Sequence, residues 1–160
     1  MREDLILDDF DRAIIDLLRR DGRASNQELA GRLGLTASTV SIRIRRMEQA
    51  NKLRVVAVSD FAAHDISVLM PLAIEVQGRP VQDVAADLLA FPEVFALHLV
   101  TGPHDIDALI TARNHEEASD LILKKFSTIK GIRSVEPAIA VQVLKYKFDV
   151  APIQEAGLRA

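Results

Sequence analysis

The chain of 160 residues contains no cysteine, so neither disulfide bonds nor thiolate metal sites are available to it. No apolar run approaches the roughly 18 residues that suggest a membrane span. The first residues are acidic and lack the basic and apolar regions of a signal peptide. These absences predict a soluble protein of the cytoplasm with no membrane partner.

Sequence signatures of catalysis are missing as well. The four histidines form no helical ligand pair, and the chain has neither a glycine-rich phosphate loop nor a Gly-x-Ser-x-Gly motif. His104, Asp105 and Asp107 carry the chemistry of a metal site, but a turn histidine beside strand carboxylates is more often solvated or hydrogen-bonded. We therefore predict no catalytic residues, no metal and no cofactor.

The net charge of −3 conceals an uneven distribution. Residues 1–54 hold 11 Lys and Arg against 9 Asp and Glu, whereas residues 55–160 hold 9 against 14. Residues 32–54 alone contain six bases and one acid. Such a basic segment is typical of an element that faces DNA, although the same charges also suit a solvated helix face.

Apolar residues at helical spacing predict three helices in the N-terminal third of the chain. The second begins after the capping box Ser25-Asn-Gln-Glu28 and ends at Gly34, where a left-handed residue is needed. Thr36 caps the third helix, and Asn51 ends it, because asparagine tolerates the left-handed conformation.

The second and third helices form a predicted helix-turn-helix, with residues 37–50 as its recognition helix. Small hydroxyl side chains at the start of that helix permit close approach to a major groove, and arginines further along reach phosphates or guanine edges. Arg43 lies nearer the apolar stripe, so it either reaches a phosphate or pairs with an acid of the same chain. A three-helix module without a nucleic-acid role is the alternative for the whole unit. The residues predicted to lie at or near DNA are Asn26, Thr36, Ser38, Thr39, Ile42, Arg43, Arg45 and Arg46.

After residue 53 the hydrophobic pattern becomes that of a β-α-β-β-α-β domain. Pro71 demotes part of its first strand toward a sheet edge. Two helices would cover one face of the sheet, so an apolar open face predicts self-association. The predicted strands span residues 53–58 (a link between the two halves), 68–76, 94–100, 106–112 and 135–144, and the helices start at Pro80 and span residues 116–129.

Short motifs follow one another in a fixed order from Leu7 to Lys147. They are Leu7-Asp8-x-x-Asp11-x-x-Ile14, Asp21-Gly22-Arg23-x-Ser25-Asn26-x-Glu28-Leu29-Ala30, Leu33-Gly34-Leu35-Thr36, Arg43-Ile44-x-Arg46-Met47-Glu48, Glu93-Val94, Val100-Thr101-Gly102-Pro103-His104-Asp105, Gly131-Ile132 and Lys145. In this order and spacing the chain resembles the Lrp/AsnC family, the leucine-responsive or feast/famine transcriptional regulators. Two positions depart from that family's pattern: Asn51 stands where glycine is usual, and Asp107 where an apolar residue is usual.

The resemblance implies a sequence-specific DNA-binding transcriptional regulator whose assembly or DNA affinity responds to an amino acid or a related small metabolite. Its partners would be double-stranded DNA, that effector and further copies of the chain, as a homodimer that assembles into tetramers or octamers. The predicted fold is α+β, a winged-type helix-turn-helix followed by a ferredoxin-like βαββαβ domain. We expect the DNA-binding domain in residues 1–53, a linker strand and hinge in 54–67, the effector-binding and oligomerisation domain in 68–150, and a tail in 151–160.

The turn at residues 100–105 resembles the family's Gly-x-x-Asp ligand loop. Its backbone N–H groups suit a carboxylate, and Asp105 suits an ammonium group, although a plain tight turn capped by Asp105 is the alternative. Asp105 and Asp107 project to one side of a strand and repel unless a cation or a proton lies between them, which favours a cationic or polar effector over leucine. The predicted effector residues are Val100, Thr101, Gly102, His104, Asp105 and Asp107, with His115, Ala140 and Gln142 added from the resemblance alone.

Two other functions stay open at this point. Some haem-pathway decarboxylases resemble the same family and share its two-domain plan, although the basic residues 32–54 favour DNA. An architectural protein would wrap DNA with little sequence preference.

Overall fold

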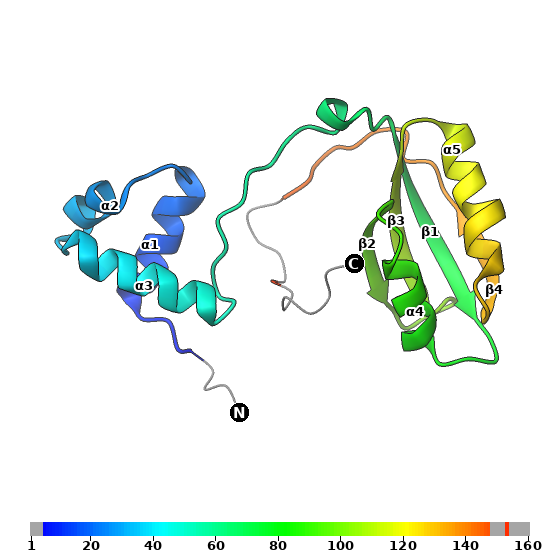
Figure 1. The fold of residues 1–160 in the computed structure, drawn as a ribbon, viewed down its shortest axis with the longest axis horizontal. Helices are drawn as coiled ribbons and strands as arrows, with labels where there is room; N and C mark the ends of the chain where they lie inside the picture. The colour runs from blue at the N-terminus through cyan, green and yellow to red at the C-terminus, as the bar shows by residue number, and fades with distance from the viewer. Residues whose placement is uncertain (1–4, 148–152, 154–160) are drawn as a thin grey trace. The chain divides into compact units, whose positions relative to one another are not determined.

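Residues 5–147 and 153 are described in the computed structural model of the chain (Figure 1). The chain divides into two units, the first reaching Val58 and the second spanning Ser59–Tyr146. Each unit has a hydrophobic core of its own. Within the described residues, no helix combines the length and the apolar character needed to cross a bilayer.

The first unit contains the three predicted helices, α1 (Asp9–Arg20), α2 (Asn26–Leu33) and α3 (Ala37–Gln49). The predicted capping box of α2 is confirmed: the Ser25 hydroxyl accepts from the Glu28 N–H, and the Glu28 carboxylate accepts from the Ser25 N–H at 2.8 Å. Gly34 then ends α2 with a φ of 67°. The helices enclose a core whose fully buried members are Ile14, Leu29, Val40 and Met47.

Asn51 has the predicted left-handed conformation, with a φ of 54°. The strand predicted for residues 53–58 is wrong for the single chain: Leu53 packs into the helical core, and residues 54–58 are exposed and outside any strand. A strand requires a second backbone to accept and donate its hydrogen bonds, and the sheet of the described chain does not include residues 54–58. The described residues of this unit form the three helices of the predicted helix-turn-helix domain.

The second unit has the predicted β-α-β-β-α-β order. Its sheet is antiparallel with strand order β2-β3-β1-β4, and α4 and the helical segment that begins with α5 cover one face (Figure 1). Alternate residues of β1 and β3 point into this helix-covered core, as the period of two requires. The elements are β1 (Val68–Val76), α4 (Val81–Leu89), β2 (Val94–Leu99), β3 (Ile106–Ala112), α5 (His115–Asp120) and β4 (Ile132–Pro137), preceded by a 3₁₀ turn, Phe61–His64.

Pro71 does not lie at a sheet edge, and that prediction was wrong. β1 is a central strand between β3 and β4. Pro71 accepts from the Ala138 N–H at 2.8 Å, so its carbonyl and its nitrogen, which has no proton to donate, face the β4 side. The missing donor coincides with the end of β4 at Pro137, several residues before the predicted end at residue 144, although Ala140 still donates to the Leu69 carbonyl at 3.2 Å.

The helix predicted for residues 116–129 is present but irregular. α5 gives way to a π-helical segment, Leu121–Lys125, and then to a 3₁₀ turn, Phe126–Thr128. Leu121, the first residue of the π segment, and Phe126, which follows the segment, are both buried in the core. Apolar spacing predicted a helix here, but it does not distinguish a π segment from an α-helix.

We expect Gly131→Ala to destabilise the second unit by about 2–4 kcal/mol, because two effects coincide there. Gly131 has a φ of 96°, and an added Cβ would lie 2.8 Å from the Cβ of Arg79 and 3.0 Å from Cγ2 of Val84. Gly78→Ala is the matched control, since its φ is 74° with no atom within 4 Å of the added Cβ. Gly78→Ala should lower the free energy of unfolding, measured in urea, by only about 1 kcal/mol. Equal losses in the two variants would contradict the steric argument.

Candidate DNA and effector sites

A cluster of hydroxyl groups lies at the N-terminus of α3. The Thr36 hydroxyl accepts from the Thr39 N–H at 3.2 Å and lies 2.8–2.9 Å from the hydroxyls of Thr39 and Ser38. Asn26 is exposed at the first position of α2. These short side chains leave the backbone at the start of α3 open to close approach.

The next turn of α3 exposes an apolar side chain. Ile42 is 69% exposed, and Arg45 is also exposed, while Val40 and Met47 on the opposite side are buried. Water does not stabilise an exposed isoleucine side chain, whereas the thymine methyl group in a major groove offers an apolar surface that isoleucine can contact. The outward side of α3 thus combines hydroxyl, apolar and cationic groups.

Arg43 and Arg46 do not project freely from α3. Nη1 of Arg43 donates to Oδ2 of Asp8 at 2.7 Å and to Oδ1 of Asp11 at 2.8 Å. Nη2 of Arg46 donates to Oδ2 of Asp11 at 2.6 Å. The guanidinium of Arg43 also lies 5.5 Å from the ring centroid of Phe10. The acid partner considered for Arg43 is therefore observed, whereas the sequence reasoning assigned no acid to Arg46.

Asp11 is the centre of this network, and the sequence reasoning missed it. Its side chain has no solvent exposure, so its charge requires close partners. The N–H of Asp11 and the guanidinium of Arg43 lower the pKa of the Asp8 carboxyl, and the two carboxylates raise the pKa of Arg43. The available signal was the Leu7-Asp8-x-x-Asp11 motif, in which Asp8 and Asp11 also form the capping box of α1.

The loop at residues 100–105 is closed by hydrogen bonds at its base. Val100 donates its N–H to the Asp105 carbonyl, and Asp105 donates its N–H to the Ile74 carbonyl, both at 3.0 Å. Within the described chain, the N–H groups of Thr101 and Gly102 have no acceptor. Gly102 has a φ of 151° and open space around it, so the backbone conformation, rather than a close neighbour, requires glycine. The loop can present N–H groups to a ligand.

The two aspartates of the loop region each have a partner of their own. Oδ2 of Asp105 accepts from the Val76 N–H at 2.7 Å, and Oδ1 of Asp107 lies 2.7 Å from Nε2 of His104. Asp107 remains 52% exposed. The premise that the two carboxylates repel unless a cation lies between them is therefore not met, because each negative charge already receives a hydrogen bond.

The remaining predicted effector residues lie at the other end of the sheet. His115 begins α5, which follows the far end of β3 from the loop. Ala140 bonds to Leu69, whose partner on β3 is Thr111, while the loop adjoins Ile106. At about 3.4 Å per residue these two positions are roughly 17 Å apart along the strand. Gln142 follows Ala140 in an exposed segment. A single chain does not bring all nine residues together.

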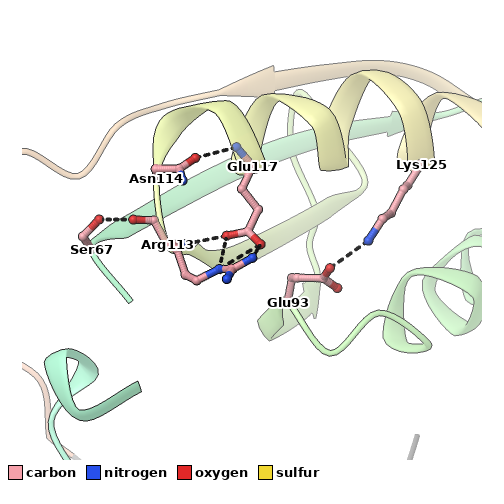
Figure 2. Close-up of polar contacts among 6 residues, drawn as sticks. All are labelled: Ser67, Glu93, Arg113, Asn114, Glu117 and Lys125. Carbon is pink, nitrogen blue, oxygen red and sulfur yellow. Dashed lines mark hydrogen bonds and ion pairs between the residues drawn. The ribbon is translucent and has the colours of Figure 1, made fainter. Parts of the chain in front are cut away.

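A cluster of polar side chains lies at that far end (Figure 2). The guanidinium of Arg113 binds the Glu117 carboxylate, which lowers the pKa of Glu117, and Asn114 caps α5. Lys125 donates to Glu93 at 2.8 Å. Burial opposes ionisation of Glu93, but Lys125 and the backbone N–H outweigh it and lower the pKa of this carboxyl. Ser67, which precedes β1, donates to the Arg113 carbonyl. The cavity, of about 240 Å³, is lined by Ile66, Pro92, Glu93, Thr111, Ala112, Arg113 and Glu117.

The face of the sheet opposite α4 and α5 carries a shallow hollow of about 490 Å³. Pro71, Ala73 and Leu109 supply its apolar part. The predicted apolar open face is thus present, with His98, Asp107 and Glu136 adding charge and polarity around it.

Comparison with known proteins extends these observations. An AsnC-type helix-turn-helix domain matches residues 7–48, and an Lrp/AsnC ligand binding domain matches residues 72–150. The chain is 35% identical over 144 residues to an uncharacterized HTH-type transcriptional regulator of Pyrococcus horikoshii, covering 89% of this chain and 90% of that protein.

Solved structures agree with the fold. Escherichia coli AsnC has a TM-score of 0.82 at 23% identity, covering 89% of this chain and 97% of that one. A transcriptional regulator of Neisseria meningitidis, solved as a complex with L-Met, has a TM-score of 0.82 at 20% identity, covering 91% and 97%. With an N-terminal DNA-binding helix-turn-helix, a C-terminal ligand-binding domain and relatives named as regulators, the chain belongs to the Lrp/AsnC family of transcriptional regulators.

Proposed function

We propose that the protein recognises specific DNA sequences through α3 and adjusts this binding to the level of an amino acid or a similar metabolite. The observation that carries the proposal is the outward side of α3, where Ser38, Ile42 and Arg45 are exposed opposite a buried apolar stripe. Hydroxyl, methyl and guanidinium groups in sequence along one helix match the chemistry of base edges and phosphates in a major groove. The proposed contacts are Asn26, Thr36, Ser38, Thr39, Ile42, Arg43, Arg45 and Arg46.

The proposed effector site combines residues of more than one subunit. The loop at residues 100–105 offers backbone N–H groups for a carboxylate, and Oδ1 of Asp105 is left for an ammonium group. His115, Ala140 and Gln142 contribute from a second copy of the chain, because in one chain they lie at the opposite end of the sheet. The Neisseria meningitidis regulator solved with L-Met supports an amino acid as the effector class. Asp107 is bonded to His104 but stays half exposed near the loop, so its carboxylate favours an effector with a polar or cationic side chain.

We propose a regulator rather than an enzyme. The Pyrococcus horikoshii relative is named as a transcriptional regulator, which supports regulation over the decarboxylase alternative. The mixed chemistry of the outward side of α3 favours sequence-specific binding over architectural wrapping, since phosphate contacts alone would need only cations.

Replacing Arg46 with alanine should weaken binding to a DNA fragment selected from random sequence by the wild-type protein. The loss should be about tenfold, because a charge-assisted hydrogen bond is removed. The plot of log affinity against log salt should flatten by about 0.9 for each phosphate that the variant no longer neutralises. Lys130→Ala removes a cation from the second unit and is the control, with unchanged affinity and slope. Unchanged binding by Arg46→Ala would remove Arg46 from the interface.

Calorimetric titration of lysine, arginine and leucine tests the effector proposal. Lysine or arginine should bind more tightly than leucine, and Asp107→Ala should abolish that preference, because it removes the carboxylate that would accept the second cationic group. Asp120→Ala, an exposed acid paired with Lys124 on α5, should leave the preference intact. Tight leucine binding that survives Asp107→Ala would contradict the proposed role of Asp107.

The apolar open face of the sheet predicts a two-fold dimer as the smallest stable assembly, which also suits a pseudo-palindromic DNA site. Leu109→Glu would place a charge in the middle of this face and should shift the protein toward monomers in light scattering at micromolar concentration. A wild-type protein that is monomeric under these conditions would contradict the proposal.

A further inference from the structure

We propose that Asp11 positions Arg46 for DNA, by binding one part of its guanidinium group and leaving the rest to a backbone phosphate. The inference rests on the proposed contact between α3 and DNA. It assigns a role in DNA binding to a buried acid of α1, a helix that contributes none of the proposed DNA contacts.

The two arginines that bind Asp11 are held in different ways. Arg43 uses the same nitrogen, Nη1, for Asp8 and Asp11, lies against the Phe10 ring and is only 22% exposed. Arg46 uses Nη2 alone, makes no other hydrogen bond within the described residues and is 47% exposed. Arg43 therefore joins α1 to α3, whereas Arg46 is anchored at one nitrogen and keeps Nε and Nη1 for another acceptor.

An anchored guanidinium is a better phosphate ligand than a free one. A surface arginine loses rotamer entropy when it binds, and a fixed orientation reduces that cost. The planar fork allows one guanidinium to bind a carboxylate and a phosphate through different N–H groups. Because Asp11 has no solvent exposure and is bonded to the Asp8 N–H as well, it is a rigid anchor.

Electrostatics at long range predicts the opposite effect of removing Asp11. Replacing a carboxylate in a DNA-binding domain with a neutral side chain makes the domain more positive and should strengthen its attraction to DNA. If Asp11 positions Arg46, Asp11→Asn should instead weaken binding. The sign of the change distinguishes the two roles.

The experiment is a double-mutant cycle on the full-length protein with the selected DNA fragment. Asp11→Asn should weaken binding roughly fivefold in the wild-type background and have no further effect in the Arg46→Ala background. Asp16→Asn is the matched control, because it removes an exposed carboxylate from the same helix. That carboxylate lies 3.4 Å from Nη1 of Arg19, and its loss should leave DNA binding equal or slightly tighter. Thermal unfolding of each variant confirms that the folded protein is compared.

Each outcome bears on a separate claim. If Arg46→Ala weakens binding while Asp11→Asn does not, the positioning role is overturned and the proposed DNA contact stands. Additive losses would also overturn it, because Asp11 would then act independently of Arg46. If Arg46→Ala changes neither affinity nor salt slope, both the contact and the positioning role are wrong.

Arg46→Lys keeps the inference testable if Asp11→Asn fails to fold. Lysine preserves the charge but has a single ammonium in place of the planar fork. If Arg46 acted only as a free surface charge, lysine would replace it without loss of affinity for DNA. If Arg46 binds Asp11 and a phosphate at the same time, Arg46→Lys should lower the affinity for DNA severalfold. Full binding by Arg46→Lys would overturn the inference.

Discussion

Asp11 has no solvent exposure, and its two oxygens are bonded to arginines of α3, so α1 and α3 are joined by charge as well as by apolar packing. A buried carboxylate left without its partners would cost several kcal/mol, on the order of the stability of a small domain. The charge network therefore constrains the rotation of α3 about its own axis. That rotation decides which residues face outward. Successive residues of an α-helix lie about 100° apart around its axis, so a rotation of that size would turn the apolar stripe outward in place of Ile42 and Arg45.

The parts of the fold that depend on local interactions could be predicted from the sequence. The capping box at Ser25 and Glu28, the left-handed Gly34 and the left-handed Asn51 all involve atoms a few residues apart, and all are present. The β-α-β-β-α-β order followed from hydrophobic period alone, because strands and helices leave different spacings in the chain. The same spacing placed Ser38, Ile42 and Arg45 on the outward side of α3, where the structure has them exposed.

Features that depend on distant partners were not predictable in this way. The sequence gives no sign of which strands neighbour Pro71, so its place in a central strand is evident only when β3 and β4 are seen on either side. Arg46 and Asp11 are far apart in sequence and meet through tertiary packing. The ion pairs Arg113–Glu117 and Glu93–Lys125 likewise join residues next to the ends of β3 and β2 to α5 and the π segment, although the Arg113–Glu117 spacing of four was visible in the sequence. Apolar periodicity does not distinguish the π segment after α5 from an α-helix, so the sequence did not reveal it.

Two disagreements between sequence and structure concern residues 53–58 and the predicted effector residues. Residues 53–58 have the composition of a strand but lie outside the strands of the described chain, and their apolar side chains Val55, Val56 and Val58 are exposed. The predicted effector residues are divided between the two ends of β3. The proposed effector site needs a second set of side chains, which under the function proposed above a second copy of the chain would supply. If the effector site is built in this way, the residues that bind the effector lie where two copies of the chain meet. Effector binding and assembly would then be linked, because a ligand that bridges two copies stabilises the assembly by its own binding free energy.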